Sequence, residues 1–179
     1  MMILCLCMGK LNAADFVDTE VPPEYIKYVR EIRSEFSKEM EREYSLKLIA
    51  EGGSMPYKVC SIAMRFECEK KVNIDEARWL LITLQRKLMD KVNKHEKIRP
   101  FLDKYPFPVA GADVQLSFQE VPDKNAKNPE FVYSARNKIF YCKDNEEKGA
   151  YDRIFVEPYE EALKRYKLSE KPLVFKDVI

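Results

Sequence analysis

The chain has 179 residues, of which 46% are hydrophobic and 12% aromatic, enough apolar material for the core of one domain. Its 31 basic and 30 acidic residues give a net charge of +1, so the composition excludes the strong basic excess of a general nucleic-acid binder. The sequence also lacks any apolar run of the roughly 18 residues that span a bilayer, which excludes an integral membrane segment.

Residues 1–14 are predicted to be a cleaved signal peptide. Residues 1–8 are apolar, Lys10 is the one charge, and the small residues Ala13 and Ala14 follow. This pattern predicts cleavage after Ala13 or Ala14 and export to the periplasm or out of the cell. Residues 15–179 would then form a single α+β domain. The alternative is a cytoplasmic protein in which residues 1–14 form a buried strand.

A first helix is predicted from about residue 24 to residue 44, because Pro22 and Pro23 suit its entry and apolar residues then recur at the helical period. The opposite face is dense in charge, which is typical of a surface helix. The predicted apolar stripe consists of Ile26, Val29, Ile32, Phe36, Met40 and Tyr44.

Residues 45–50 are predicted to form a short strand, and residues 51–56 a turn that contains Gly52, Gly53 and Ser54. Backbone amides in such a loop can bind an anion, so these three residues are candidate binding residues and the location of a hypothetical small hydrolase-like site. Residues 57–69 then alternate between apolar and mixed side chains, which predicts a strand with Cys60 and Cys68 on its apolar face.

The central feature is a long amphipathic helix from Ile74 to about Ile98. Asn73 is a suitable N-cap, and Glu76 completes a capping box. Pro100 ends the helix, because proline restricts the residue before it. The predicted buried stripe consists of Ala77, Leu81, Leu84, Leu88 and Val92.

An aromatic corner follows at residues 99–107. Phe101, Tyr105 and Phe107 lie between three prolines, so we expect them to close the end of the core, with a ligand pocket as the alternative. Arg99 is expected to pair with Asp103 or with an anionic partner. The candidate binding residues here are Arg99, Phe101 and Tyr105.

The remainder predicts more sheet and a short helix. Residues 112–119 alternate as a strand, residues 122–130 form a polar loop, and residues 131–136 and 139–143 form a hairpin. Residues 144–149 are predicted to be a loop, residues 159–168 a last helix, and residues 172–179 an edge strand or a loose tail. Exposed aromatic residues such as Tyr133 or Tyr141 on an uncovered sheet face would indicate a partner surface.

No residue pattern predicts a catalytic set, a metal site or a cofactor. His95 is the one histidine and is expected to be an exposed polar residue. Without residues 1–14, three cysteines remain, and they are expected either to be buried free thiols or to include one disulfide from Cys142 to Cys60 or Cys68.

Several short segments resemble a largely uncharacterised set of small exported proteins of host-associated bacteria. They are Gly52-Gly53-Ser54-Met55, Glu76-Ala77-Arg78, residues 98–102, and Tyr105-Pro106-Phe107. The resemblance covers about residues 36–120. It implies a bacterial, exported protein and carries no activity to any residue.

Together these patterns predict an α+β fold, in which an antiparallel sheet of four or five strands is covered on one face by two long helices, with a short third helix near the C-terminus. The function predicted is that of a non-enzymatic exported binding or interaction protein. The alternatives are a small hydrolase-like enzyme at Gly52–Met55 and a carrier of an apolar ligand between helices and sheet. The expected partner is a protein or a small apolar ligand, not nucleic acid, and the oligomeric state is left open.

Overall fold

The structure is a computed structural model that describes residues 23–118, 128–145, 147–170, 172 and 175. Predictions for residues 1–14 and for most of the 122–130 loop lie outside these residues. The elements in chain order are α1 (Glu24–Tyr44), β1 (Leu46–Ser54), β2 (Ser61–Cys68), α2 (Ile74–Lys94), the 3-10 turns η1 (Glu96–Phe101) and η2 (Val109–Gly111), β3 (Ala112–Phe118), β4 (Phe131–Ala135), β5 (Lys138–Asn145), β6 (Ala150–Pro158) and α3 (Tyr159–Leu168).

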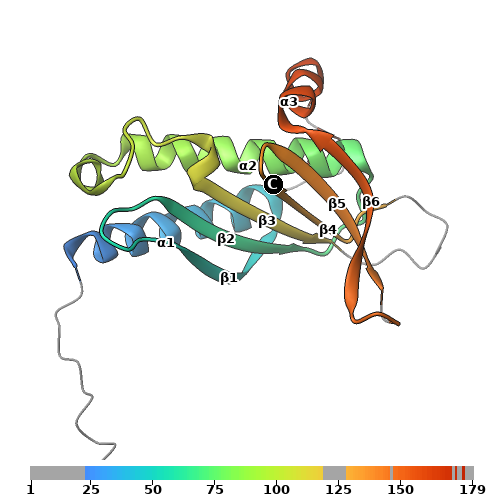
Figure 1. Cartoon of the computed structure of the whole chain (residues 1–179), viewed down its shortest axis with the longest axis horizontal. Coiled ribbons are helices and arrows are strands. Elements are labelled where there is room, and N and C mark those ends of the chain that lie inside the picture. The colour runs from blue at the N-terminus through green and yellow to red at the C-terminus, as the bar shows by residue number, and fades with distance from the viewer. Residues whose placement is uncertain (1–22, 119–127, 146, 171, 173–174, 176–179) are drawn as a thin grey trace, which may run out of the picture.

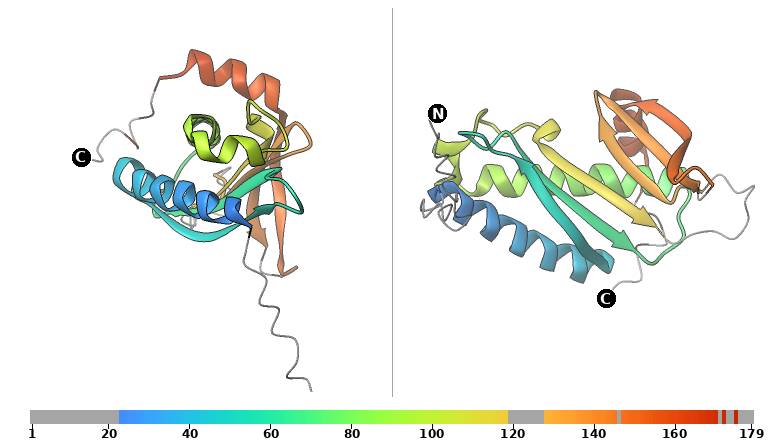
Figure 2. Two further views of the ribbon diagram at one scale, coloured as in Figure 1. Left: turned by 90° about the vertical axis from the view of Figure 1, so that its left-hand side faces the viewer. Right: turned by 60° about the horizontal axis from the view of Figure 1, so that its bottom comes forward.

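The molecule has two layers, a sheet and the helices on one side of it (Figure 1 and the left view of Figure 2). The strands lie in the order in which they occur in the chain, from β1 at one edge to β6 at the other. Strands β2 and β3 are parallel because α2 carries the chain back across the sheet between them, and the other neighbouring pairs are antiparallel. The prediction of an α+β fold is confirmed, and the helical elements include the 3-10 turns η1 and η2 besides α1, α2 and the short α3. The sheet, however, has six strands instead of four or five and is mixed instead of antiparallel.

The largest local correction concerns the predicted Gly52-Gly53-Ser54 turn, which is wrong. These residues continue β1 and pair with Ala63, Ile62 and Ser61 of β2. Gly53 has a φ of +147°, and a Cβ atom there would lie 2.3 Å from the carbonyl oxygen of Ser61. Glycine is needed at this position because the two strands approach closely, not because the chain reverses.

Helix α2 begins as predicted. Asn73 Oδ1 accepts from the amide of Glu76, and the Glu76 carboxylate accepts from the amide of Asn73, which completes the capping box. The predicted stripe from Ala77 to Val92 is fully buried. The helix ends at Lys94, four residues earlier than expected, because η1 takes the chain into the corner before Pro100 is reached.

Helix α1 packs its predicted stripe on the sheet, where Phe36 meets Phe66 of β2 edge to face at 6.0 Å. Its charged side meets α2 through ion pairs that join Lys87 to Glu39 and Glu43. Helix α3 lies near the β6 edge and contacts α2, where Thr83 and Tyr166 are hydrogen-bonded at 3.4 Å. No helix among the described residues is both long enough and apolar enough to cross a membrane.

Candidate functional site

The structure brings the two predicted groups of site residues to the same end of the molecule. The amide of Val59, just before β2, donates to the carbonyl oxygen of Phe101 at 2.8 Å, and the amide of Asp103 donates to Val59 at 3.2 Å. The polar backbone groups of the glycine segment are already hydrogen-bonded. The Gly52 carbonyl accepts from the guanidinium of Arg33, and the Ser54 amide donates to the Ser61 hydroxyl of β2. The anion-binding loop expected at Gly52–Ser54 is therefore replaced by an edge of the sheet.

The aromatic corner is built mainly as packing. Arg99 donates to the carbonyl oxygen of Asn93 at 3.2 Å and lies 5.4 Å over the ring of Tyr105, whereas it forms no ion pair with Asp103 among the described residues. Phe101 packs on Tyr25 of α1 at 5.9 Å. The expected Arg99–Asp103 pair is wrong, because the guanidinium binds the Asn93 carbonyl in the last turn of α2 instead, and pairing of Arg99 with an anionic partner stays a prediction.

The other face of the sheet, which neither α1 nor α2 covers, carries a row of stacked aromatic rings. Cross-strand pairing places Phe131 and Tyr133 of β4 on this face, beside Phe140 of β5. The Tyr133 and Phe140 rings stack at 5.0 Å, and the Phe131 ring stacks on Tyr133 at 5.4 Å and on Tyr151 of β6 at 5.1 Å. We call this surface the open sheet face and these four rings the aromatic row.

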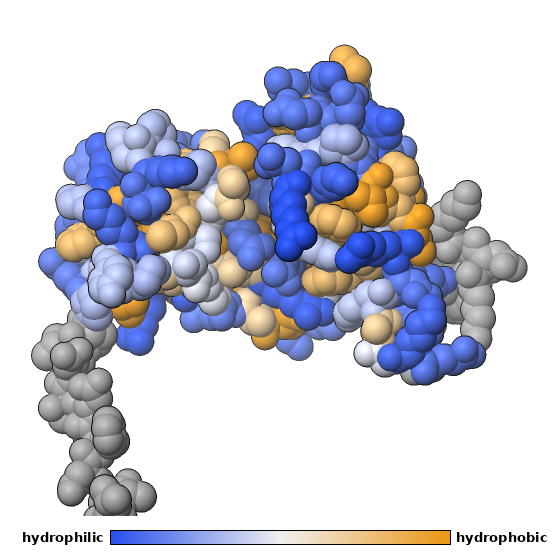
Figure 3. Space-filling view, in the orientation of Figure 1, coloured by the Kyte–Doolittle hydropathy of each residue, from blue (hydrophilic) through white to orange (hydrophobic). Residues whose placement is uncertain are grey.

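Two arginines flank the aromatic row. Arg65 of β2 lies 4.6 Å over the Phe131 ring, and Arg153 of β6 lies 5.2 Å over Phe140. Arg65 is fixed further, because its Nε and Nη2 atoms both donate to Ser117 Oγ, at 3.2 and 2.9 Å. Apolar and charged side chains consequently alternate over this face, which is turned to the viewer in Figure 3.

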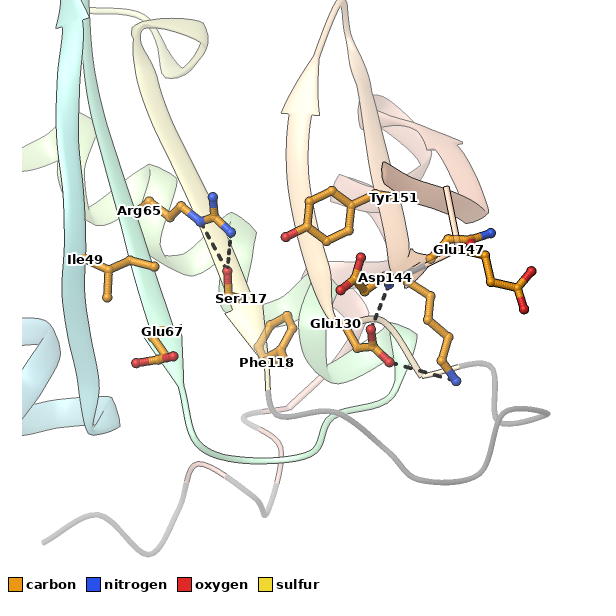
Figure 4. Close-up of a pocket in the computed structure, with 11 residues that line it drawn as sticks. Ile49, Arg65, Glu67, Ser117, Phe118, Glu130, Asp144, Glu147 and Tyr151 are labelled. Carbon is orange, nitrogen blue, oxygen red and sulfur yellow. Dashed lines mark hydrogen bonds and ion pairs between the residues drawn. The ribbon is translucent and has the colours of Figure 1, made fainter. Parts of the chain in front are cut away.

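A groove of about 660 Å³ lies on the open sheet face (Figure 4). One wall comes from β1 and β2 and includes Ile49, Arg65 and Glu67, while β5 and β6 supply Asp144 and Tyr151 on the other side. Ser117 and Phe118 at the end of β3 lie between the two walls. We call this hollow the open-face groove, and it spans the sheet from its first strand to its last.

The groove lining is acidic although the chain as a whole is nearly neutral. Its charged residues are four carboxylates and two cations, namely Glu67, Glu130, Asp144, Glu147, Arg65 and Lys143. Glu130 is the one buried carboxylate among them: its side chain is 9% exposed, and its Oε2 accepts from the amide of Asp144 at 2.8 Å. Its Oε1 lies 3.9 Å from Lys143 Nζ and accepts no hydrogen bond from any described residue.

The other reactive side chains that the structure describes are not assembled into a second site. Cys60, Cys68 and Cys142 are free thiols, and Cys60 is exposed, which corrects its predicted place on the apolar face because β2 begins only at Ser61. His95 packs 5.5 Å from the Tyr28 ring and lies 3.6 Å from Glu31. Within the described ranges, no three His, Cys, Asp or Glu side chains are placed to hold a metal ion.

The sequence contained part of the signal for the open sheet face. Alternation in residues 131–136 places Phe131 and Tyr133 on one side of a strand, and Tyr133 lies on the uncovered face as the sequence allowed. Tyr141 does not, because it is fully buried on the helix side. The groove itself was not predicted, since its residues come from five strands and two connecting segments and have no local spacing in common.

Scans of the chain against protein-family models, curated proteins and solved structures each found no match. The function is therefore inferred from the geometry of the chain itself.

Proposed function

We propose that the chain is a non-enzymatic binding protein, exported after removal of residues 1–14, that holds a partner protein on its open sheet face. The observation that carries this proposal is the aromatic row next to the open-face groove. A sheet face left to water usually carries small or charged side chains, whereas this face carries the partly exposed rings of Tyr133, Phe140 and Tyr151, which stack around the buried ring of Phe131.

The aromatic row has the composition of a binding surface. Tyrosine and arginine are enriched where proteins meet, since both combine a large apolar surface with a polar end. Tyr151 is 48% exposed at the rim of the groove, and Arg65 is held rigidly by Ser117. Rigid side chains lose little conformational entropy when a partner binds.

Site-specific photo-crosslinking tests this assignment. A photoreactive phenylalanine analogue is placed at Tyr133 on the open sheet face, and in a second protein at Tyr57, which is 91% exposed between β1 and β2. After irradiation of the native cells, we expect a discrete crosslinked species from the Tyr133 position and none from the Tyr57 position.

The two positions separate a specific surface from random collision. Equal crosslinking at Tyr133 and Tyr57, or crosslinking at Tyr57 alone, would remove the open sheet face as the binding surface. Export is tested separately by the intact mass of the chain in each cell fraction. We expect a product lacking residues 1–13 or 1–14 outside the cytoplasm, and full-length protein in the cytosol would contradict export.

A further inference from the structure

We propose that the open-face groove binds arginine side chains on an extended segment of the partner protein. This inference rests on the proposed function and makes it specific, because it names the chemistry of the partner. It is argued from charge, from the environment of Glu130 and from the shape of the groove.

Charge complementarity points to a basic occupant. Of the four carboxylates in the lining, Glu67, Asp144 and Glu147 form no ion pair with any described residue. The two cations Arg65 and Lys143 offset two of the four negative charges, so the lining keeps a net charge of −2 (2 − 4). A basic segment would therefore meet uncompensated negative charge, which favours its association and opposes that of an acidic segment.

Glu130 supplies the acceptor at the centre of this negative charge. A carboxylate that is nine-tenths buried ordinarily has all its oxygens hydrogen-bonded, but Glu130 Oε1 accepts no hydrogen bond from the described residues. Its nearest cation, Lys143 Nζ, lies 3.9 Å away, which is beyond hydrogen-bond distance and leaves this oxygen with an unfilled acceptor position. A guanidinium entering the groove would then donate to Oε1 while Oε2 keeps its bond from Asp144.

The groove also suits a guanidinium better than an ammonium group. Guanidinium groups are planar, bind carboxylates through paired donors and stack on aromatic rings. The half-exposed ring of Tyr151 lies on the same wall as Asp144. Arg65 already stacks in this way on Phe131 from within the chain. The partner's arginine would make the same kind of contact with the exposed side of the Tyr151 ring.

An extended segment fits the dimensions of the groove. The groove extends from the wall that carries Ile49 of β1 to the wall that carries Tyr151 of β6, and its volume of about 660 Å³ exceeds what a single side chain fills. An extended segment that crosses from one wall to the other would point every second side chain into the groove, so that one arginine lies over Glu67 and the next over Glu130.

The test measures binding of fluorescently labelled hexapeptides to the full chain by polarisation. The probe is an acetylated, amidated peptide of alternating arginine and alanine, compared with lysine–alanine and glutamate–alanine peptides and with free arginine amide. We expect the arginine peptide to bind most tightly, the lysine peptide more weakly and the glutamate peptide not at all.

Two variants locate the site. Glu130→Gln keeps an oxygen for the Asp144 amide and removes the charge. We expect this variant to bind the arginine peptide with an affinity about thirtyfold lower than that of the wild type. The double variant Glu67→Gln/Glu147→Gln alters only exposed, unpaired carboxylates. It should lower the affinity for the arginine peptide without affecting folding. Glu41→Gln, the same change on the exposed surface of α1, is the control and should leave affinity unchanged.

Each outcome decides the inference. Absence of arginine-peptide binding, or equal affinity in the wild type, Glu130→Gln and the double variant, would overturn it. Free arginine amide binding as tightly as the peptide would overturn the extended segment. If the Tyr133 crosslink forms while the peptide fails to bind, the proposed function stands and only this inference fails. If both are absent, both fail.

Discussion

Arg78 of α2 and Glu157 of β6 form a buried ion pair, in which Nε lies 2.6 Å from Oε1 and each side chain is only 4% exposed. Tyr141 of β5 donates its hydroxyl to the same oxygen at 2.6 Å. Burial opposes the charge of Arg78, but the hydrogen bonds that it donates to Glu157 and Asp75 prevail and raise its pKa. The last strand is thus attached to the helix layer through a charged contact.

Removing one member of this pair should cost far more than removing both. Glu157→Ala removes the shared acceptor of Arg78 Nε and of the Tyr141 hydroxyl, and Arg78 keeps only its contact with the exposed Asp75. We therefore expect the free energy of unfolding to fall by about 3 kcal/mol. The triple variant Arg78→Met/Tyr141→Phe/Glu157→Leu replaces the pair and the hydroxyl bonded to it with apolar side chains, and should recover most of that loss. Urea denaturation measures both, and a single variant within about 1 kcal/mol of wild type would contradict a structural role.

Removal of either of two buried tyrosine hydroxyls should change the stability of the fold in a different direction. The Tyr159 hydroxyl is buried without a hydrogen-bond partner among the described residues, and burial raises its pKa to about 12. Tyr159→Phe should leave stability unchanged or raise it by about 1 kcal/mol, whereas Tyr141→Phe, which removes a bond to a carboxylate, should lower it by about 2 kcal/mol. Thermal or urea unfolding of the two variants checks this, and equal effects would contradict the assigned contacts.

Adjacent glycines in β1 offer a matched comparison. Gly53→Ala places a Cβ atom against the Ser61 carbonyl at a φ of +147°, so we expect a loss of about 1–3 kcal/mol. At Gly52 the nearest atom would be Ala63 Cβ at 4.0 Å, so Gly52→Ala should cost less than about 1 kcal/mol. Equal unfolding midpoints for the two variants would show that β1 does not approach β2 as described.

Stability should depend on pH through Glu39. Its carboxylate is partly buried, which opposes its charge, but Lys87 and Lys91 at 3.2 and 3.3 Å prevail and lower its pKa. A lowered carboxyl pKa stabilises the fold above the unfolded-state value of about 4.3, and this stabilisation is lost as pH falls through the folded-state value.

The measurement compares wild type with Glu39→Gln at several pH values. Wild type should be more stable by less than about 1 kcal/mol at pH 7, because both lysines and the carboxylate are partly solvated. The difference should shrink as the pH is lowered toward about 3, below the ordinary glutamate pKa. A difference that stays constant or widens in acid would contradict the ion pairs between α1 and α2.

The parts of the fold that the sequence predicted are those with local causes. The capping box of Asn73 and Glu76 involves residues three apart, and the stripes of α1 and α2 repeat at the helical period. The sequence predicted a turn at the glycines of β1 because a Gly-Gly pair commonly marks a turn. In the structure, glycine is required at Gly53 by its close approach to Ser61, which belongs to another strand. That contact has no trace in the local pattern.

Strand β6 was missed because it lies at the sheet edge. Most of its residues are exposed, so Ala150–Pro158 shows no clear apolar alternation. The parallel pairing of β2 and β3 follows from the path of α2 and not from either strand alone. The open-face groove depends on all of these, since Ile49 and Tyr151 come together only when the six strands are ordered.

Hydroxyl-radical footprinting tests the open sheet face most directly, by comparing the purified chain with the chain in its native cell fraction. We expect Tyr133, Phe140 and Tyr151 to be labelled less in the native fraction, because a partner covers them. Tyr57 and Leu168, both about nine-tenths exposed and away from the aromatic row, should be labelled equally in both. Equal labelling of the aromatic row in the two samples, or protection at Tyr57 and Leu168 instead, would contradict binding at this face.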